Sequence, residues 1–113
     1  MTAKISWSDF QKIDLRVGEV TRVEDFTEAR SPAYKVWVDM GKELGVKKSS
    51  AQITHLYTKD ELVGKKVLAV VNFPPKQVGP FMSEILVTGF YNADNHVVLA
   101  TVDKDIENGA RLA

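Results

Sequence analysis

Residues Lys65–Phe90, KKVLAVVNFPPKQVGPFMSEILVTGF, place two short apolar segments on either side of a proline-rich connection. The segments, Val67–Val71 and Ile85–Thr88, are rich in β-branched residues and too short for typical helices, so we predict two strands buried on at least one face. Residues 72–84 between them hold three prolines and a glycine, which exclude a helix and a central strand. We therefore expect a stiff loop of about a dozen residues, a length that often carries function.

The apolar side chains of this loop leave two interpretations open. Phe73, Val78, Phe81 and Met82 either form a small satellite core beneath the loop or present an apolar surface to a partner or a second copy.

The composition is that of an ordinary soluble domain. The 113 residues are 44% hydrophobic and 27% charged, and they suffice for one domain, residues 1–113, with one core. No apolar run approaches the length of a membrane span, and the N-terminus lacks the apolar core of a secretory signal. The absence of cysteine excludes disulfides, thiol nucleophiles and zinc–thiolate sites. A cytoplasmic location without membrane insertion is the simplest expectation.

Charge is distributed unevenly along the chain although the net charge is zero. Residues 30–83 carry nine basic and four acidic side chains, whereas the segments before and after them are net acidic. A positive face toward an anionic partner is therefore compatible with the neutral total, which nevertheless argues against the whole-surface attraction of non-specific DNA binders.

Alternating apolar and polar residues predict further strands. Residues 13–24 alternate almost without error, and Gly18 within them suggests a bulge or a bend in a barrel strand. Residues 34–41 alternate as well, which places Trp37 on the outer face, where it either packs beneath a loop or covers a partner. Residues 96–102 predict a last, long strand.

Two short helical segments interrupt the strands. Residues 7–12 predict a turn capped by Ser8 or Asp9, whose two aromatic residues are spaced to pack on the core. Thr58, with Glu61 three residues later, has the spacing of a capping box and predicts a one-turn helix.

Five or six strands with one short helix and no long helical crossover predict an all-β fold. A helix between the third and fourth strands is the arrangement of an OB-fold, a five-stranded Greek-key barrel. We therefore predict an OB-fold barrel with N- and C-terminal extensions.

No motif indicates catalysis. His55 and His96 lie forty-one positions apart and match no metal-ligand spacing, and the chain has neither a nucleophile elbow nor a phosphate-binding glycine loop. We expect a protein without enzymatic activity, cofactor or bound metal.

Several segments together resemble one family. They are DLRVG at 14–18, SSAQIT at 49–54, VNFPP at 71–75 and MSEILV at 82–87. The first segment is typical of a broad tRNA-binding family, whereas the other three are typical of its CsaA branch. Over essentially its whole length the sequence is similar to CsaA, the export-associated chaperones of bacteria and archaea, whose tRNA-binding domain is also appended to some methionyl-tRNA synthetases.

This resemblance implies an OB-fold homodimer that binds unfolded or precursor polypeptides and cooperates with the export machinery. It also implies at least an inherited capacity to bind tRNA. For polypeptides, a groove with an apolar floor and a polar rim accepts varied side chains and bonds to the peptide backbone. The residues that we predict for a peptide-binding or dimer groove are Phe73, Pro74, Pro75, Phe81, Met82, Asn72, Gln52 and Ser83.

The alternative function is structure-specific tRNA binding through a basic face of the barrel. The candidate residues are Arg16, Arg30, Lys35, Lys47, Lys48, Lys65, Lys66 and Lys76. The sequence shows no outward aromatic ladder, which argues against stacking of single-stranded bases, but recognition of folded tRNA by shape and backbone needs none.

Overall fold

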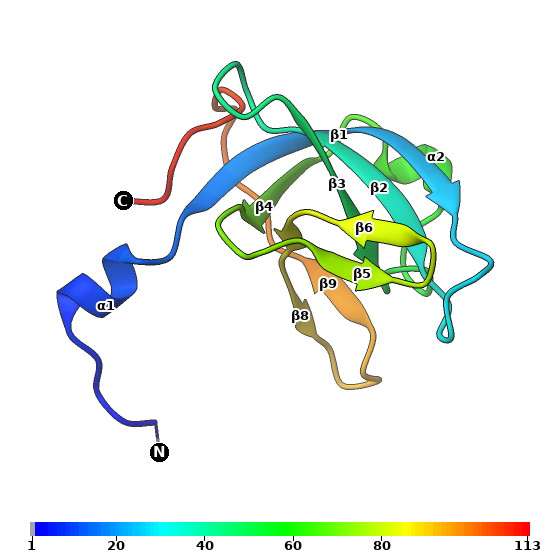
Figure 1. The fold of residues 1–113 in the computed structure, drawn as a ribbon, viewed down its shortest axis with the longest axis horizontal. Coiled ribbons are helices and arrows are strands. Elements are labelled where there is room, and N and C mark those ends of the chain that lie inside the picture. Colours follow the sequence, from blue (N-terminus) through cyan, green and yellow to red (C-terminus); the bar gives the residue numbers. More distant parts are fainter. Residues whose placement is uncertain (1) are drawn as a thin grey trace.

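The computed structural model describes residues 2–113 and consists mainly of short strands that form a nearly closed barrel (Figure 1). In chain order the elements are α1 (Trp7–Gln11), β1 (Leu15–Asp25), β2 (Tyr34–Asp39), β3 (Val46–Ala51), α2 (Lys59–Leu62), β4 (Lys66–Val70), β5 (Lys76–Val78), β6 (Phe81–Ser83), β7 (Leu86–Val87), β8 (Gly89–Tyr91) and β9 (Val97–Leu99). The helix α2 lies between the third and fourth strands, and the predicted OB-fold is confirmed.

The barrel is built on an antiparallel five-stranded sheet in the order β3-β2-β1-β4-β7. The gap between its two edge strands is bridged by the residues that precede β7. The Glu84 amide donates to the Lys48 carbonyl oxygen at 2.8 Å, and the Ser50 amide donates to the Ser83 hydroxyl at 3.1 Å. These bonds join the end of β6 to β3 and nearly close the barrel.

The long strand β1 bends so that it pairs with two neighbours. Its first half pairs with β4 and its second half with β2, with a shift of register between Val20 and Arg22 that marks a bulge. Before the bulge, Gly18 is packed so closely that an added Cβ would lie 2.4 Å from Met40 Sδ and 2.5 Å from Val38 Cγ1. The predicted bulge is therefore present, but it lies between Val20 and Arg22. At Gly18 itself the backbone packs closely against core side chains.

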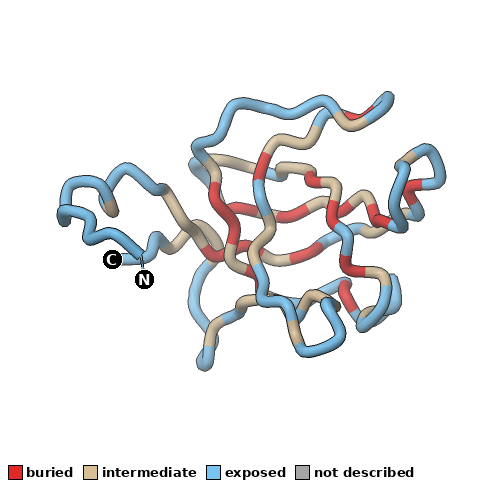
Figure 2. Tube along the Cα trace, turned by 90° about the horizontal axis from the view of Figure 1, so that it is seen from below, coloured by how far each residue is buried: buried red, intermediate tan, exposed pale blue. Residues whose placement is uncertain are grey.

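The core fills the interior of the barrel, mainly with aliphatic side chains. Figure 2 shows along the trace which residues are buried. The main cluster comprises Val20, Tyr34, Val36, Val38, Met40, Ala51, Ile53, Leu62, Val67, Ala69 and Ile85. On the outer face of β2, Trp37 is half-buried and meets the ring of Phe81 edge-on, with the ring centroids 6.1 Å apart. Trp37 was expected either to pack beneath a loop or to cover a partner, and it packs beneath the segment that follows β4.

The expected irregular loop at residues 72–84 contains a small hairpin, so that part of the prediction was wrong. Strands β5 and β6 pair around a turn at Gly79, whose φ of 54° suits glycine, and the prolines lie outside the ladder. Some of the apolar loop side chains form the predicted satellite core, and others are exposed as the alternative predicted. Phe81 is buried in a second cluster with Phe26 and Ala33, whereas Phe73 and Met82 are exposed.

The N-terminal segment departs from the sequence-based expectation. The cap of α1 is Ser6, whose hydroxyl accepts from the Asp9 amide at 3.1 Å while the Asp9 carboxylate accepts from the Ser6 amide. Trp7 does not pack on the core: its side chain is 66% exposed, and it contacts Phe10 of the same helix with centroids 5.5 Å apart. Both chain termini project from the same side of the barrel (Figures 1 and 2).

The C-terminal third is more finely divided than predicted. The expected strand over residues 96–102 is shortened to β9, which pairs with β8 in a separate two-stranded ribbon. After β9 the Ala100 carbonyl oxygen accepts from the Leu68 amide at 3.2 Å, outside a continuous ladder. Among residues 2–113 no helix has the length and apolarity needed to span a bilayer.

Candidate functional site

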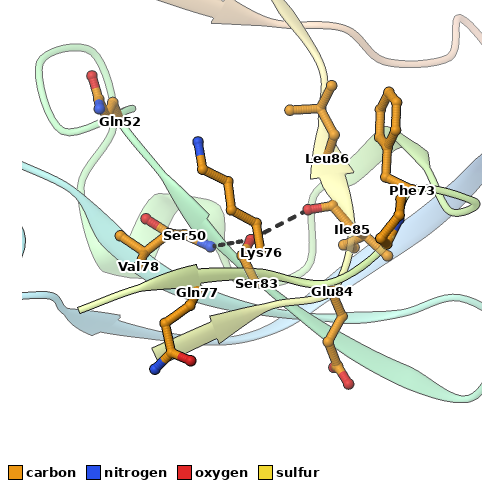
Figure 3. A pocket seen from close by; sticks show the side chains of 11 residues that line it. Ser50, Gln52, Phe73, Lys76, Gln77, Val78, Ser83, Glu84, Ile85 and Leu86 are labelled. Atoms are coloured by element: carbon orange, nitrogen blue, oxygen red, sulfur yellow. Dashed lines mark hydrogen bonds between the residues drawn. The ribbon is translucent and has the colours of Figure 1, made fainter. Parts of the chain in front are cut away.

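A cavity of about 620 Å³ opens beside the β5–β6 hairpin (Figure 3). It is lined by Ser50, Gln52, Phe73, Pro74, Lys76, Gln77, Val78, Ser83, Glu84, Ile85 and Leu86. Five of these side chains are apolar and six are polar or charged, so the cavity combines an apolar surface with hydrogen-bonding groups.

Two stretches far apart in the chain build this cavity. One is the end of β3 with Gln52, the residue directly after it, and the other is a set of residues within the segment from Phe73 to Leu86. In Figure 3 the side chains of Phe73, Lys76 and Leu86 extend to the same side of the hairpin. Phe73 and Leu86 are 56% and 49% exposed, so both present apolar area without partners in the described chain.

Ser83 fixes the inner wall of the cavity. Its hydroxyl accepts from the Ser50 amide at 3.1 Å and lies 3.5 Å from both the Ser49 hydroxyl and the Ile85 carbonyl oxygen. On the same wall, the Glu84 carboxylate accepts from the Lys48 amide at 3.1 Å. These bonds hold the hairpin against β3 and give the wall a fixed shape.

The strand β5 has a free edge. It pairs with β6 on one side, and in the described part of the chain no strand pairs with its other side. Lys76, Gln77 and Val78 of this strand line the cavity. An edge strand with unpaired backbone groups accepts an extended peptide as an additional strand, with side chains of the peptide entering adjacent pockets.

The structure brings together half of the predicted groove residues. Gln52, Phe73, Pro74 and Ser83 line the cavity, whereas the other four predicted residues do not. Pro75, Met82 and Asn72 are exposed beside it, and Phe81 is buried beneath the hairpin.

Asn72 makes two long-range hydrogen bonds that the sequence does not reveal. Its side-chain oxygen accepts from the Asp14 amide at 3.0 Å, and its side-chain nitrogen donates to the Lys12 carbonyl oxygen at 2.7 Å. These two bonds tie the start of β1 to the end of β4.

Sequence reasoning missed several lining residues. Ser50, Gln77, Glu84, Ile85 and Leu86 join the cavity only because the hairpin folds back beside β3. The signal available in the sequence was Gly79-Pro80, which marks a turn with three-residue strands on either side.

The predicted basic residues are divided among different faces. Lys35 and Lys48 lie on the outer face, where their amines stand 5.6 Å and 5.2 Å from the ring centroid of Phe81. Arg22, which the sequence did not single out, extends this face, since its guanidinium carbon lies 4.5 Å from the Trp37 ring centroid. We call Arg22, Lys35 and Lys48 the basic face. Lys47 pairs with Val38 and so points to the opposite side of the sheet from its neighbour Lys48.

The other predicted cations have different surroundings. Lys76 lines the cavity, Arg30 is exposed in the β1–β2 connection, and Lys65 lies 5.9 Å from the Tyr57 ring centroid. Lys66 donates to the Asn108 side-chain oxygen at 2.6 Å and lies 3.6 Å from a Glu19 carboxylate oxygen.

Arg16 is engaged within the protein. Its guanidinium donates to Asp14 at 2.9 Å and to Glu43 at 2.9 Å, and its side chain is 13% exposed. The hydrogen bonds from Arg16 lower the pKa of Asp14, against the opposing effect of burial. Arg16 is therefore occupied by carboxylates of the protein itself. In the basic face Arg22 pairs with Glu24, whereas Lys35 and Lys48 form no ion pair within residues 2–113.

The two histidines, which the sequence left as isolated residues, are in contact. The rings of His55 and His96 stack with centroids 4.2 Å apart and planes 7° apart.

Sequence comparison identifies the family. The profile of the family described as "Putative tRNA binding domain" matches residues 15–111. The chain is 36% identical over 109 residues to the methionine–tRNA ligase of Methanocaldococcus jannaschii and 33% identical over 108 residues to that of Thermococcus onnurineus. It spans 16% and 14% of the length of these relatives, and the family that covers it is a binding domain and not a catalytic one.

Solved structures give a finer match. A CsaA chaperone protein from Picrophilus torridus is 52% identical with a TM-score of 0.92, covering 97% of this chain and 100% of that chain. A chaperone CsaA from Bacillus anthracis is 46% identical with a TM-score of 0.92, covering 98% and 100%. A MetRS-related protein from Pyrococcus horikoshii is 26% identical with a TM-score of 0.86, covering 99% and 100%. The chain therefore belongs to the tRNA-binding-domain family and, within it, to the CsaA proteins.

Proposed function

We propose that this protein is a cytoplasmic chaperone that binds unfolded or precursor polypeptides for export, and that the cavity beside β5 is its peptide-binding groove. The observation that carries the proposal is the combination of exposed apolar side chains with a free strand edge. Phe73 and Leu86 offer apolar contacts to varied side chains, and β5 offers backbone groups that any extended peptide satisfies. Similarity to two proteins described as CsaA chaperones supports this function.

The test is a titration of a fluorescently labelled, unfolded precursor peptide, followed by anisotropy at low and high salt. We expect saturable binding that changes little with salt, because apolar contact and backbone pairing dominate. Phe73→Ala should weaken binding at least about fivefold, as truncation of an aromatic anchor does.

The matched control for this experiment is Phe90→Ala. Phe90 is 69% exposed and does not line the cavity, so its truncation should leave peptide affinity unchanged. Equal effects of the two substitutions, or no effect of Phe73→Ala, would show that peptides bind elsewhere.

A second function, tRNA binding, is favoured by the basic face. Arg22, Lys35 and Lys48 gather on one side of β1–β3, although the chain as a whole is neutral. Cations clustered beside aromatic rings suit a folded RNA, whose backbone phosphates are bound by charge and whose shape sets specificity.

This second function is separated from the first by its salt dependence. The double charge reversal Lys35→Glu/Lys48→Glu should weaken tRNA binding and reduce its salt slope by about one for each phosphate that the variant no longer neutralises. Lys104→Glu, a reversal at an exposed site outside the basic face, is the control. If both variants bind tRNA equally well, the basic face does not contact RNA.

A homodimer is the third part of the proposal. The two termini present exposed apolar residues, among them Ile5, Trp7 and Leu112, beside an apolar cavity of about 310 Å³ formed by β1, β4 and the C-terminal segment. Such a surface is suited to a second copy of the chain, because each copy offers both projecting side chains and a recess.

A further inference from the structure

The stacked histidines bring together two segments of the chain, and neither ring has a role in the proposed functions. His55 belongs to the connection between β3 and α2, and His96 belongs to the β8–β9 hairpin. Their rings are nearly parallel, with centroids 4.2 Å apart. His96 is half-buried, whereas His55 is exposed, so the stack is accessible from the side of His55.

A small cavity of about 260 Å³ adjoins this pair. Its lining residues are Ser31, Pro32, Gln52, His55, Tyr91, Asn95, His96 and Val97. They come from the β1–β2 connection, the segment after β3 and the β8–β9 hairpin, which lies at the lower edge of the barrel in Figure 1. No carboxylate, lysine or arginine is among them, so the cavity is a neutral, polar and aromatic site.

The geometry of the rings excludes a shared metal ion in this arrangement. The lone pair of an imidazole nitrogen lies in the plane of its ring, and two parallel planes separated by this stacking distance cannot both contain one ion. Over residues 2–113, moreover, no third histidine or carboxylate gathers with them into a possible metal site.

A flat heterocycle fits the lining better. Gln52 and Asn95 each offer an amide with donors and an acceptor, and Ser31 offers a hydroxyl. None of these three side chains makes a hydrogen bond to another residue within 2–113, so all remain available to a ligand. Stacking on an aromatic platform combined with hydrogen bonds to a polar edge is how proteins hold an unpaired base.

The neighbouring charge suits the rest of a nucleotide. Arg30 is exposed and directly precedes Ser31, and it forms no ion pair within the described chain. A cation next to a neutral stacking site favours a ligand whose base enters the cavity and whose phosphate stays outside it.

We propose that His55 and His96 form a stacking platform for one unpaired nucleobase, with Gln52 and Asn95 bonding to its edge and Arg30 to its phosphate. The platform adjoins the peptide groove, since Gln52 lines both cavities, and it is separate from the basic face. If the base belongs to an RNA, this proposal rests on the proposed tRNA binding. A free nucleotide presents the same chemistry, and for that ligand the proposal does not depend on tRNA binding.

The test uses 2-aminopurine, an adenine analogue whose fluorescence is quenched by stacking. Three probes are titrated: the 2-aminopurine riboside monophosphate, a single-stranded tetraribonucleotide containing one 2-aminopurine, and the same tetranucleotide with an abasic residue at that position, the last followed through an end label. We expect binding to quench the fluorescence of at least one of the two 2-aminopurine probes. Where the 2-aminopurine tetranucleotide binds, its abasic counterpart should bind more weakly.

Variants at position 55 identify the platform. His55→Ala should weaken base binding about tenfold, whereas His55→Phe, which keeps a flat ring, should preserve it. Wild-type affinity in His55→Ala, or absence of quenching with both fluorescent probes, would overturn the proposal. Hydrogen exchange of the β8–β9 amides shows whether either variant has lost the hairpin. If His55→Ala has lost the hairpin, the outcome is decided by the affinity of His55→Phe and by the comparison of the abasic tetranucleotide with the one that carries the base.

Parallel titration of folded tRNA separates this proposal from the one on which it partly depends. Lys35→Glu/Lys48→Glu should weaken tRNA binding and leave the monophosphate titration unchanged. Quenching of the monophosphate without any tRNA binding would support the platform as a free-nucleotide site and count against the tRNA function. Tight tRNA binding without quenching of either fluorescent probe would support the tRNA function and overturn the platform.

Discussion

Gly18 is the residue whose replacement tests the packing of the barrel most directly. An added methyl group would lie within 2.5 Å of the buried side chains of Val38 and Met40, so they must move or the strand must shift. We expect Gly18→Ala to lower the free energy of unfolding by about 1–3 kcal/mol, the usual cost of overpacking a core, as measured by urea denaturation.

A double substitution identifies the cause of that loss. Met40→Ala removes the sulfur that the new methyl group would meet, so Gly18→Ala should cost less when it is introduced into Met40→Ala than into the wild type. Equal costs in the two backgrounds would mean that Met40 does not restrict position 18.

Asp14 provides a prediction about acid stability. Hydrogen bonds from Arg16 lower its pKa below the ordinary value of 3.8, so the carboxylate stabilises the fold at neutral pH. This contribution is present above the unfolded-state pKa and is lost as the pH falls through the lower, folded-state value. Asp14→Asn should therefore destabilise the protein at pH 7 and make little difference near pH 2, as measured by urea denaturation at both values.

Asp103→Asn is the control for this pH dependence. Asp103 is exposed and makes no ion pair within residues 2–113, so its substitution should change stability little at either pH. An Asp14→Asn effect of the same size at pH 7 and pH 2 would contradict a charge-based contribution.

Among the elements, α2 depends most clearly on its cap. It has only four residues, too few for intrinsic helix stability, and its Leu62 is fully buried in the main core. The Thr58 hydroxyl accepts from the Glu61 amide at 3.2 Å, and the Glu61 carboxylate accepts from the Thr58 amide at 2.9 Å.

Thr58→Ala should therefore cost about 1 kcal/mol in the free energy of unfolding. Thr27→Ala removes the same side chain from an exposed loop and should cost much less, because within residues 2–113 the Thr27 hydroxyl makes one hydrogen bond, to the adjacent Glu28 carboxylate at 3.2 Å. Equal losses in thermal or urea denaturation would show that the capping box does not hold α2 in place.

The β5–β6 hairpin shows how one element acquires its place from another. Its strands have three residues each, and two-stranded ribbons of this size are marginal in isolation. Burial of Phe81 between Phe26 and Trp37, together with the Ser50–Ser83 and Lys48–Glu84 bonds, fixes it on the barrel. The same contacts create the cavity wall.

For the molecule as a whole, the proposed homodimer predicts a defined solution mass. Light scattering after size exclusion should give twice the chain mass of 12.6 kDa. Trp7→Glu should weaken association about tenfold or more, because a charge would replace an exposed aromatic residue at the contact.

Phe90→Glu introduces the same change at a position of similar exposure, 69% against 66%, away from the termini, and should remain dimeric. A wild-type mass of 12.6 kDa at high concentration, or dissociation caused by Phe90→Glu alone, would rule out association through the termini.

The sequence by itself determined the features that depend on local pattern. Alternation predicted β1 and β2 and the inward side chains Val36 and Val38, and the Thr58–Glu61 spacing predicted α2, which together indicated the OB-fold. The motifs at 49–54, 71–75 and 82–87 indicated the family. Of the four predicted groove residues that line the cavity, Phe73, Pro74 and Ser83 lie in the proline-rich segment and Gln52 lies in the motif at 49–54.

Tertiary structure decided what depends on long-range contact. The bend of β1 brings Gly18 against Met40, the folding of residues 76–83 onto β3 makes Leu86 part of a cavity, and the approach of two loops stacks His55 on His96. Local periodicity reports which face a side chain occupies within its own element. It carries no information about which other element covers that face, because that depends on how strands distant in sequence close the barrel.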